Sequence, residues 1–374
     1  MKILFITHET TRTGAPKVLL LFLQWLYKNT PSIEVDVVTL KGGQLTDAFK
    51  KNCTHFYDYS LATQPTKLSI AQRLLLKLKL YKRPNLKERF IENLANNHYN
   101  VIYANTVVSI PLAVAISKKN SLAKVVAHMH ELPAIINLSL PNFESYITSI
   151  SQFIVPSHLV KANLVQHWSV DENNIKVVYE CSEVENLLKE KKVNTVFTVG
   201  ASGYVHWRKG HDVFVQLARY VTKNYPNCKM QFVWVGTLPK TEEIILQEDL
   251  KKLGLDGIIK FVGEVDNPAS YYNNFDVFVM TSREDPFPLV CIEVGMLGKP
   301  IVSFENAVGT NEILAEAGGY IVPYLDIELM AEKIVSYYNS PGLKVQHGAL
   351  NREAFSKFTP DIICPQLLEA VSNI

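Results

Sequence analysis

The stretch TSREDPFPLVCIEVGMLGKP, Thr281 to Pro300, decides how the rest of the chain is interpreted. It follows the apolar run 276–280, which is short and rich in β-branched residues, as buried strands are. It ends at the breaker sequence 298–300, and the apolar run 301–304 then begins a second strand. The stretch is therefore predicted to be the loop and helix that connect two parallel strands.

Two acids, Asp285 and Glu293, lie eight residues apart in this stretch. Ligands of parallel α/β sheets bind at the loops that leave the carboxyl ends of strands, and the N-terminus of the following helix favours phosphate. We expect Asp285 where the loop meets the helix and Glu293 about two turns inside it. A carboxylate among apolar helix residues needs hydrogen-bond partners, such as backbone amides or a sugar diol. The alternative interpretation makes Asp285 a helix cap and Glu293 a solvated helix residue.

The pattern D-P-F-P-L-V-C-I-E resembles the E-x7-E signature of retaining, nucleotide-sugar-dependent glycosyltransferases of family 4, with Asp285 in place of the first Glu. The resemblance implies the GT-B fold, an α/β architecture of two Rossmann-like domains whose parallel sheets face each other across a cleft. It also implies that Glu293 binds the ribose hydroxyls of the donor nucleotide and that Asp285 lies beside the transferred sugar. The backbone amides of Phe287, Pro288 and Leu289 are expected near the sugar and the phosphate.

A second phosphate-binding element is expected in the loop 201–212, ASGYVHWRKGHD, which follows a predicted strand. The loop resembles the second-domain entry loop of family 4, where an Arg and a Lys neutralise the donor diphosphate. Lys209 matches that Lys, Gly203 or Tyr204 stands where the Arg is usual, and Arg208 is the candidate replacement. Cations stabilise the charge that a leaving diphosphate gains. A basic surface turn is the alternative interpretation.

Two further predicted strands end at Gly236 and at the turn Gly263-Glu264-Val265. Relatives in the family place the nucleobase near the second of these turns, against the backbone. These four residues complete the predicted donor-binding set.

The chain opens with a predicted strand at 2–7, a glycine-bearing loop and a Leu-rich helical run at 17–27, which is how a doubly wound α/β domain begins. Gly14 allows the backbone to approach a ligand, and the Thr-Gly-Ala-Pro loop resembles the first loop of family 4, which faces the cleft. A plain turn glycine is the alternative. The G-x-G-x-x-G dinucleotide fingerprint is missing from the sequence, which argues against a dehydrogenase.

Polar residues follow two later strands of the same half: Asn105 after one, and His130 with Glu131 after the next. Because the carboxyl ends of parallel strands share one edge of a sheet, we expect these residues beside Gly14 and Ala15 on the acceptor side. In the family, a His in this region lies near the donor sugar. A hydrogen-bonded rim residue is the alternative for His130.

A chain of 374 residues exceeds the size at which a single core usually stops growing, so two domains are expected. The polar run 182–194 is the predicted linker. We therefore predict an acceptor-side domain over 1–185, joined by a C-terminal helix at 360–374, and a donor domain over 186–359.

Composition is that of an ordinary soluble globular protein, with 47% apolar and 20% charged residues, and a net charge of +2 indicates no particular partner. Five scattered cysteines without a CxxC pair argue against a disulfide framework or a zinc site. An Asp-x-Asp motif is missing as well, so we expect no obligate metal and no cofactor besides the nucleotide-sugar co-substrate. Without a signal peptide or an apolar run of about 18 residues, a cytoplasmic protein is expected.

The segment 67–89 is strongly basic and is interleaved with leucines. It fits a basic amphipathic helix that lies on an anionic membrane, on the inner face. It fits equally an ordinary surface helix whose leucines pack inward. Nucleic acid is the poorest fit, since aromatic stacking residues do not accompany the charge.

Together these patterns predict a retaining hexosyl- or glycosyltransferase that moves a sugar from a nucleotide-diphosphate sugar to a saccharide or lipid-linked acceptor, in cell-surface polysaccharide biosynthesis. The predicted catalytic residues are Asp285, Lys209, His130 and Glu293. Retention is implied by the resemblance. The nucleophile and acid pair of a retaining hydrolase is not evident in the sequence, so a front-face displacement assisted by the departing phosphate is favoured.

Two other functions remain open from the sequence. A GT-B-type nucleotide-sugar epimerase would share the fold and would turn over the donor without an acceptor. A catalytically degenerate nucleotide-sugar-binding partner protein is favoured by Asp285 in place of Glu and by the missing upstream Arg.

Overall fold

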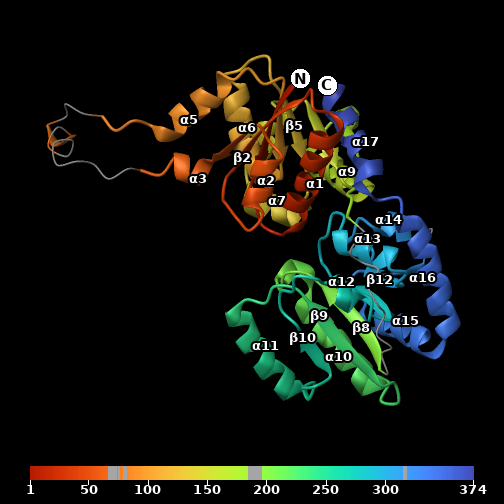
Figure 1. Ribbon diagram of the computed structural model, residues 1–374. Coiled ribbons are helices and arrows are strands. Elements are labelled where there is room, and N and C mark those ends of the chain that lie inside the picture. The colour runs from red at the N-terminus through yellow and green to blue at the C-terminus, as the bar shows by residue number, and fades with distance from the viewer. Residues whose placement is uncertain (66–73, 75, 79–81, 184–195, 315–317) are drawn as a thin grey trace. The chain divides into compact units, whose positions relative to one another are not determined.

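The computed structural model describes residues 1–374 except 66–73, 75, 79–81, 184–195 and 315–317. The described residues form two compact units. Unit 1 comprises Met1–Val155, Leu164–Lys176 and Cys364–Ile374, and unit 2 comprises Pro156–Asn163 and Val177–Ile363. Each unit holds one sheet flanked by helices (Figure 1). The predicted fold class, two Rossmann-like α/β units with parallel sheets, is confirmed.

The sheet of unit 1 has seven strands in the order β3-β2-β1-β4-β5-β6-β7. Its strands are β1 Lys2–Thr7, β2 Glu34–Thr39, β3 His55–Asp58, β4 Val101–Asn105, β5 Lys124–His128, β6 Gln152–Val155 and β7 Ile175–Val177. The order reverses at β1, where β2 and β4 both pair in parallel, so this sheet is doubly wound.

The helices of unit 1 occupy the connections between its strands. They are α1 Gly14–Asn29, α2 Thr46–Lys51, α3 Tyr59–Ala62, α5 Leu86–Ala95, η1 Val107–Ser109, α6 Ile110–Ser117, α7 Pro133–Ser139, α8 Glu144–Ile147 and η2 Glu172–Asn174. Two other helices, α9 His158–Trp168 and α17 Pro360–Ser372, contribute residues to both units.

The central strand of unit 1 is fixed by aromatic packing. Phe5 of β1 is fully buried, and its ring centroid lies 5.9 Å from that of Phe22 in α1 and 5.0 Å from that of Tyr103 in β4. Strands of parallel sheets are covered on both faces, which is why β1 reads as a continuous apolar run. The loop between β1 and α1 is therefore held between two buried elements.

The sheet of unit 2 has six strands in the order β10-β9-β8-β11-β12-β13. They are β8 Phe197–Ser202, β9 Met230–Val235, β10 Ile259–Phe261, β11 Val277–Met280, β12 Ile301–Phe304 and β13 Gly319–Val322. The helices are η3 Trp207–Lys209, α10 His211–Asn224, α11 Lys240–Leu253, α12 Ala269–Tyr272, α13 Leu289–Met296, α14 Asn311–Leu314, α15 Ile327–Asn339 and α16 Pro341–Phe355.

The strand β11, which precedes the stretch 281–300, lies inside the sheet of unit 2. All four residues of β11 are buried between β8 and β12. Gly200 of β8 makes room for the ring of Phe275, which would lie 2.1 Å from a Cβ at that glycine. The ring of Phe275 stacks on that of Phe278, with centroids 6.2 Å apart. The loop after β11 is thus anchored at its start in the core.

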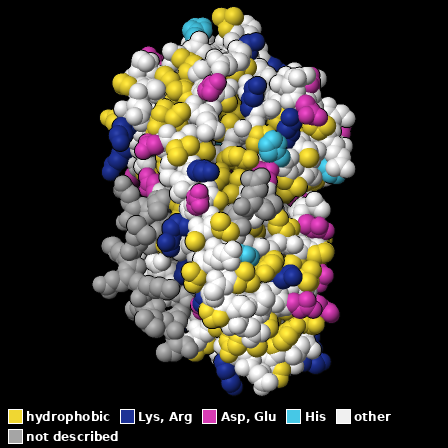
Figure 2. Space-filling view, turned by 90° about the vertical axis from the view of Figure 1, so that its right-hand side faces the viewer, with side chains coloured by type: hydrophobic (Ala, Val, Ile, Leu, Met, Phe, Trp, Pro, Cys, Tyr) yellow, Lys and Arg dark blue, Asp and Glu magenta, His cyan; other side chains and the backbone are white. Residues whose placement is uncertain are grey.

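Most predicted strands are confirmed, but β3, β7 and β13 were not predicted. Each lies at an end of its sheet and has a mixed burial pattern, so none forms a continuous apolar run. Figure 2 shows Lys and Arg interspersed with Asp and Glu over one face of the molecule, in keeping with the small net charge.

Two predictions fall on residues that the structure does not describe. The predicted domain boundary at 185/186 lies within 184–195, and the membrane-surface segment 67–89 is described only in part. Both stay predictions. Among the described residues, none of the helices is long and apolar enough to cross a membrane.

Candidate active site

The carboxyl edge of the unit 2 sheet, at which its strands end, is built from tightly joined loops. The backbone N–H of Gly203 donates to Val235 O at 2.9 Å, and that of Gly236 donates to Gly263 O at 3.0 Å. Gly236 has φ +143°, and a Cβ there would lie 2.2 Å from Gly203 O, so this close approach requires glycine. The hydroxyl of Thr237 donates to Glu264 at 3.2 Å. The predicted Gly236, Gly263 and Glu264 therefore share one edge, and Val265 follows them.

Lys209 and Asp285 form an ion pair at this edge. Lys209 Nζ donates to Asp285 Oδ2 at 2.6 Å, and the side chains are only 16% and 6% exposed. Ser282 Oγ donates to the same oxygen at 3.1 Å, and Arg208 Nη1 lies 3.9 Å from Asp285 Oδ1. Burial lowers the pKa of Lys209, and the Asp285 carboxylate acts against that shift. The structure thus brings together the predicted Lys209, Arg208 and Asp285.

Gly203, one of the two positions at which the missing Arg is usual, lies against Lys209. Gly203 has φ +149°, and a Cβ there would lie 3.3 Å from the aliphatic stem of Lys209. Arg208 comes from the other part of the same loop, and Nη1 also donates to Glu284 O at 3.1 Å. Whether Arg208 replaces the upstream Arg in function stays a prediction.

Asp285 is not at the start of the helix, contrary to the expectation. Helix α13 begins at Leu289, so Glu293 lies in its second turn and not two turns inside. The backbone N–H of Asp285 donates to Ala307 O at 2.7 Å, and Gly309 N–H donates to Asp285 O at 2.9 Å. Prolines at 286 and 288 disfavour helical backbone in the residues that precede them, which delays the helix.

A second ion pair joins the loop after β11 to the loop that carries Lys209. The guanidinium of Arg283 donates to both carboxylate oxygens of Asp212, at 2.9 and 2.7 Å, and lies 5.6 Å from the ring of Trp207. The hydrogen bond from Arg283 lowers the pKa of Asp212. Arg283 and Asp212 were not among the predicted site residues, because a contact between residues 71 positions apart leaves no local pattern.

These two loops pack so closely that a side chain at Gly210 has no room. Gly210 has φ +70°, and a Cβ there would lie 1.9 Å from Thr281 O. Gly210→Ala is expected to lower the free energy of unfolding by about 2–4 kcal/mol, from left-handed strain plus the clash. The control is Gly254→Ala, which has φ +68° and, among the described residues, an open Cβ position. That variant should lose about 1–2 kcal/mol. Urea denaturation would measure both, and equal losses would contradict the close packing.

Glu293 is half-buried on α13 beside hydroxyl groups. Ser182 Oγ donates to Glu293 Oε1 at 3.0 Å. The hydroxyl of Tyr272 shares a hydrogen bond of 2.8 Å with Ser202 Oγ, and burial together with the nearby Glu293 carboxylate raises the pKa of Tyr272. The carboxylate thus accepts a hydrogen bond from the hydroxyl of Ser182, which is the kind of bond that a ribose hydroxyl would also donate.

The residues between Asp285 and Glu293 offer fewer groups to a ligand than the sequence predicted. The Phe287 side chain is 4% exposed, and its ring packs on those of Tyr179 and Phe358, with centroids 5.2 and 5.5 Å apart. Pro288 has no N–H, so the expected set of three backbone amides reduces to those of Phe287 and Leu289.

The predicted acceptor-side residues form a network at the carboxyl edge of the unit 1 sheet. His130 Nε2 lies 3.0 Å from Asn105 Oδ1, and Asn105 Nδ2 donates to Ala15 O at 3.2 Å. Glu131 Oε2 accepts from the backbone N–H of His130 at 3.0 Å. Gly14 is the first residue of α1. The site residues thus divide into a set in unit 2 and this set in unit 1.

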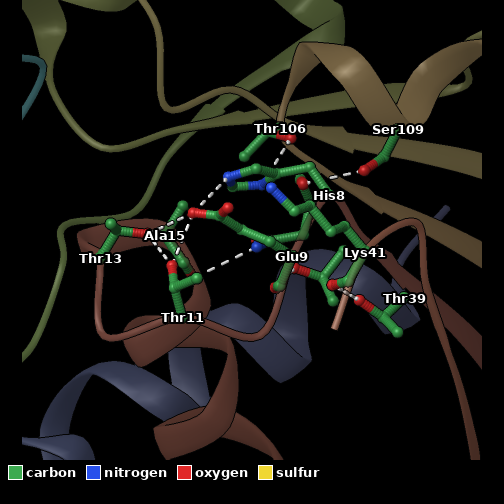
Figure 3. Close-up of polar contacts among 11 residues, drawn as sticks. His8, Glu9, Thr11, Thr13, Ala15, Thr39, Lys41, Thr106 and Ser109 are labelled. Carbon is green, nitrogen blue, oxygen red and sulfur yellow. Dashed lines mark hydrogen bonds and ion pairs between the residues drawn. The ribbon is translucent and has the colours of Figure 1, made fainter. Parts of the chain in front are cut away.

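The structure adds His8, Glu9 and Thr106 to the unit 1 set (Figure 3). His8 Nδ1 lies 3.3 Å from Thr106 Oγ1, and His8 Nε2 lies 3.5 Å from Glu9 Oε1. Burial is the main cause that lowers the pKa of His8, while Glu9 raises it. Because the His8–Thr106 contact joins residues 98 positions apart, a residue pattern does not reveal it.

His128 gives the stability of unit 1 a pH dependence. It is 2% exposed in β5, and burial lowers its pKa well below the usual value. Below the unfolded-chain pKa of about 6.5, the unfolded chain binds more protons, so stability should fall as pH falls, by up to about 1.4 kcal/mol per pH unit. His128→Gln should flatten this slope in urea denaturation at pH 5–7, with the exposed His167→Gln as control. An unchanged slope would contradict the assignment.

Comparison with known proteins finds a matching family model and similar structures. Residues 194–340 match the family model of glycosyl transferases group 1. The structure resembles that of Anabaena HepE in complex with UDP and glucose, with a TM-score of 0.79, 19% identity and 100% of both chains covered. It also resembles the lipopolysaccharide outer core galactosyltransferase WaaB, with a TM-score of 0.74, 16% identity, and 100% and 99% of the two chains covered. The two-unit architecture is thus that of GT-B proteins.

Curated relatives resemble the chain over part of its length. The capsular polysaccharide biosynthesis glycosyltransferase CapM of Staphylococcus aureus is 27% identical over 59% of this chain and 58% of its own. The amylovoran biosynthesis glycosyltransferase AmsD of Erwinia amylovora is 27% identical over 33% of this chain and 34% of its own. The chain spans about half the length of the first curated relatives that it matches.

Proposed function

We propose that the protein is a retaining glycosyltransferase of family 4 that uses a nucleotide-diphosphate sugar as donor. The observation that carries the proposal is the buried Lys209–Asp285 pair, with Arg208 beside it, at the carboxyl edge of the unit 2 sheet. A cation held at this edge before a helix N-terminus is suited to a diphosphate. The match of residues 194–340 to the family supports the same site.

In the proposed reaction, Lys209 and Arg208 stabilise the negative charge that the diphosphate gains as the glycosidic bond breaks. Asp285 keeps Lys209 in place and lies beside the transferred sugar. Glu293 accepts hydrogen bonds from the two ribose hydroxyls and fixes the nucleotide. The acceptor hydroxyl then attacks from the face that the diphosphate leaves, its proton passes to a departing phosphate oxygen, and the configuration is retained.

The donor and acceptor classes of the proposal draw on the relatives. HepE has been crystallised in complex with UDP-glucose, so a UDP-sugar is the first donor to test. CapM and AmsD are named for capsular polysaccharide and amylovoran biosynthesis, which supports a saccharide or lipid-linked acceptor in polysaccharide assembly. The same proposal includes operation without an obligate metal. It also includes a cytoplasmic location and an anionic membrane surface as partner.

Mass spectrometry of a donor panel tests this function. UDP-, GDP- and other nucleotide sugars are incubated with the unchanged protein and with Glu293→Ala. The matched control is Glu248→Ala, which removes an exposed carboxylate paired with Lys251 on α11. Release of a nucleoside diphosphate from one donor, lost only in Glu293→Ala, supports a transferase. An isomerised donor would establish the epimerase instead, and no turnover of any donor would leave the degenerate binding protein.

A further inference from the structure

The first loop of unit 1 presents the carboxylate of Glu9, which is not among the site residues predicted from the sequence. Glu9 follows β1 and precedes α1, and its side chain is 24% exposed. Glu9 Oε1 accepts hydrogen bonds from the hydroxyls of Thr11 at 2.6 Å and Thr13 at 3.2 Å, as Figure 3 shows. Among the residues that the structure describes, Oε2 has no hydrogen-bond partner. One oxygen is thus occupied, and the other remains able to accept.

His8 orients this carboxylate. In the neutral form, an N–H at Nε2 points to Glu9 across 3.5 Å, and Nδ1 accepts from the hydroxyl of Thr106 across 3.3 Å. Since burial lowers the pKa of His8, the neutral form with this tautomer is the one that the site holds near pH 7. His8 therefore acts through Glu9 and is a positioning residue.

The partner of His8 is held in a strained backbone conformation. Thr106 has φ +91°, which a β-branched residue rarely adopts. The surrounding structure fixes it, because Thr106 N–H donates to His128 O at 2.9 Å and Ser109 N–H donates to Thr106 O at 3.1 Å. Strain of this kind persists where a side chain must point in one direction, as in binding sites. Here the direction is toward His8.

The Glu9 loop is continuous with the predicted acceptor side. Ala15, in the first turn of the helix α1 that follows the loop, accepts the hydrogen bond from Asn105, and Asn105 in turn contacts His130. His130 also lies close enough to His8 to lower its pKa. Glu9 and these residues therefore occupy the same carboxyl edge of the unit 1 sheet.

We propose that Glu9 is the acceptor-binding carboxylate of this protein and that Oε2 accepts hydrogen bonds from hydroxyl groups of a neutral sugar. The inference rests on the proposed glycosyltransferase function and names the substrate class at its second site. Sugar hydroxyls donate to a carboxylate, whereas a phosphate placed beside the same oxygen would be repelled. The acceptor end that reacts is accordingly a neutral saccharide and not a sugar phosphate.

The test compares acceptor kinetics of the unchanged protein and Glu9→Gln. Glutamine keeps the side-chain length and an oxygen that accepts from Thr11 and Thr13, but it removes the charge. With the donor that the panel identifies, the acceptors are octyl glucoside, octyl galactoside and their 6-phosphates. We expect transfer to a neutral glycoside and a KM for it that is about 10- to 100-fold higher in Glu9→Gln. Hydrolysis of the donor without acceptor should stay unchanged. Glu34→Gln, on the exposed end of β2, is the matched control.

A second variant separates positioning from general packing. His8→Asn should raise the acceptor KM several-fold alone but add little in the Glu9→Gln background, because the two residues act as a unit. Additive effects would overturn the positioning role.

Four outcomes would overturn the inference. They are an unchanged acceptor KM in Glu9→Gln, equal loss in Glu34→Gln, transfer only to the 6-phosphates, and transfer to none of the glycosides while donor is still hydrolysed. In each of these the donor reaction persists, so the proposed function survives. Failure of the proposed function is recognised separately, by the absence of any donor turnover, and would remove the inference with it.

Discussion

Replacing Lys209 with methionine is expected to lower the rate of sugar transfer about 100- to 1,000-fold, the usual cost of removing one group that stabilises transition-state charge. Methionine fills a similar volume without the ammonium. The loss should appear in kcat at saturating donor, because the charge on the diphosphate grows as the bond to the sugar breaks. Steady-state release of nucleoside diphosphate would measure it.

Two further variants make this result interpretable. Lys251→Met removes an exposed lysine of α11, paired with Glu248 at 2.8 Å, and should leave the rate unchanged. Lys209→Met also leaves the Asp285 carboxylate, 6% exposed, without its cation, which costs about 3–5 kcal/mol of stability. Lys209→Met/Asp285→Asn should recover much of that stability and none of the rate. A folded Lys209→Met protein with more than about a tenth of the rate would contradict the assigned role.

Replacing Glu293 with glutamine is expected to weaken donor binding about 10- to 150-fold, since hydrogen bonds to a charged group contribute about 1.5–3 kcal/mol. The bound ribose keeps its distance from the reacting bond, so kcat should change little. Isothermal titration with the nucleoside diphosphate of the identified donor would give the Kd. Glu248→Gln serves as the matched surface control. Equal affinity in Glu293→Gln and the unchanged protein would remove Glu293 from the nucleotide site.

The fold could be predicted because both sheets are parallel and their inner strands are buried on two faces. Strands such as β1 and β11 are therefore continuous apolar runs, visible without any structure. The strands that escaped prediction, β3 and β13 among them, lie at sheet ends. They are only half covered, and their mixed composition resembles that of loops.

The residues of the proposed donor site could be chosen from the sequence, but their local geometry could not. The spacing of Asp285 and Glu293 indicated both acids, yet the prolines between them delay the helix to Leu289. The Arg283–Asp212 pair connects residues 71 positions apart, and no local pattern marks such a contact. Residue types therefore suggested the proposed chemistry, while the long-range packing had to come from the structure.

The geometry of the proposed acceptor site, at the carboxyl edge of the unit 1 sheet, was also not predictable from the sequence. Gly14 and Ala15 drew attention because a glycine loop after a first strand is a known ligand-binding arrangement. Glu9 lies in the same loop, but its role depends on the hydroxyls of Thr11 and Thr13 and on His8. Thr106, which holds His8, lies 98 positions away. The contacts of Glu9 itself are local, whereas the orientation of His8 depends on a residue that is distant in the sequence.

A crystal structure of the protein with the nucleoside diphosphate of its donor tests the central claim most directly. We expect a phosphate oxygen within hydrogen-bond distance, about 3 Å, of Lys209 Nζ, and both ribose hydroxyls on the Glu293 carboxylate. The nucleobase should then lie against the backbone near Gly263. A nucleotide bound elsewhere, with the Lys209–Asp285 pair untouched and Glu293 still bonded to Ser182, would contradict the assignment of this edge as the donor site.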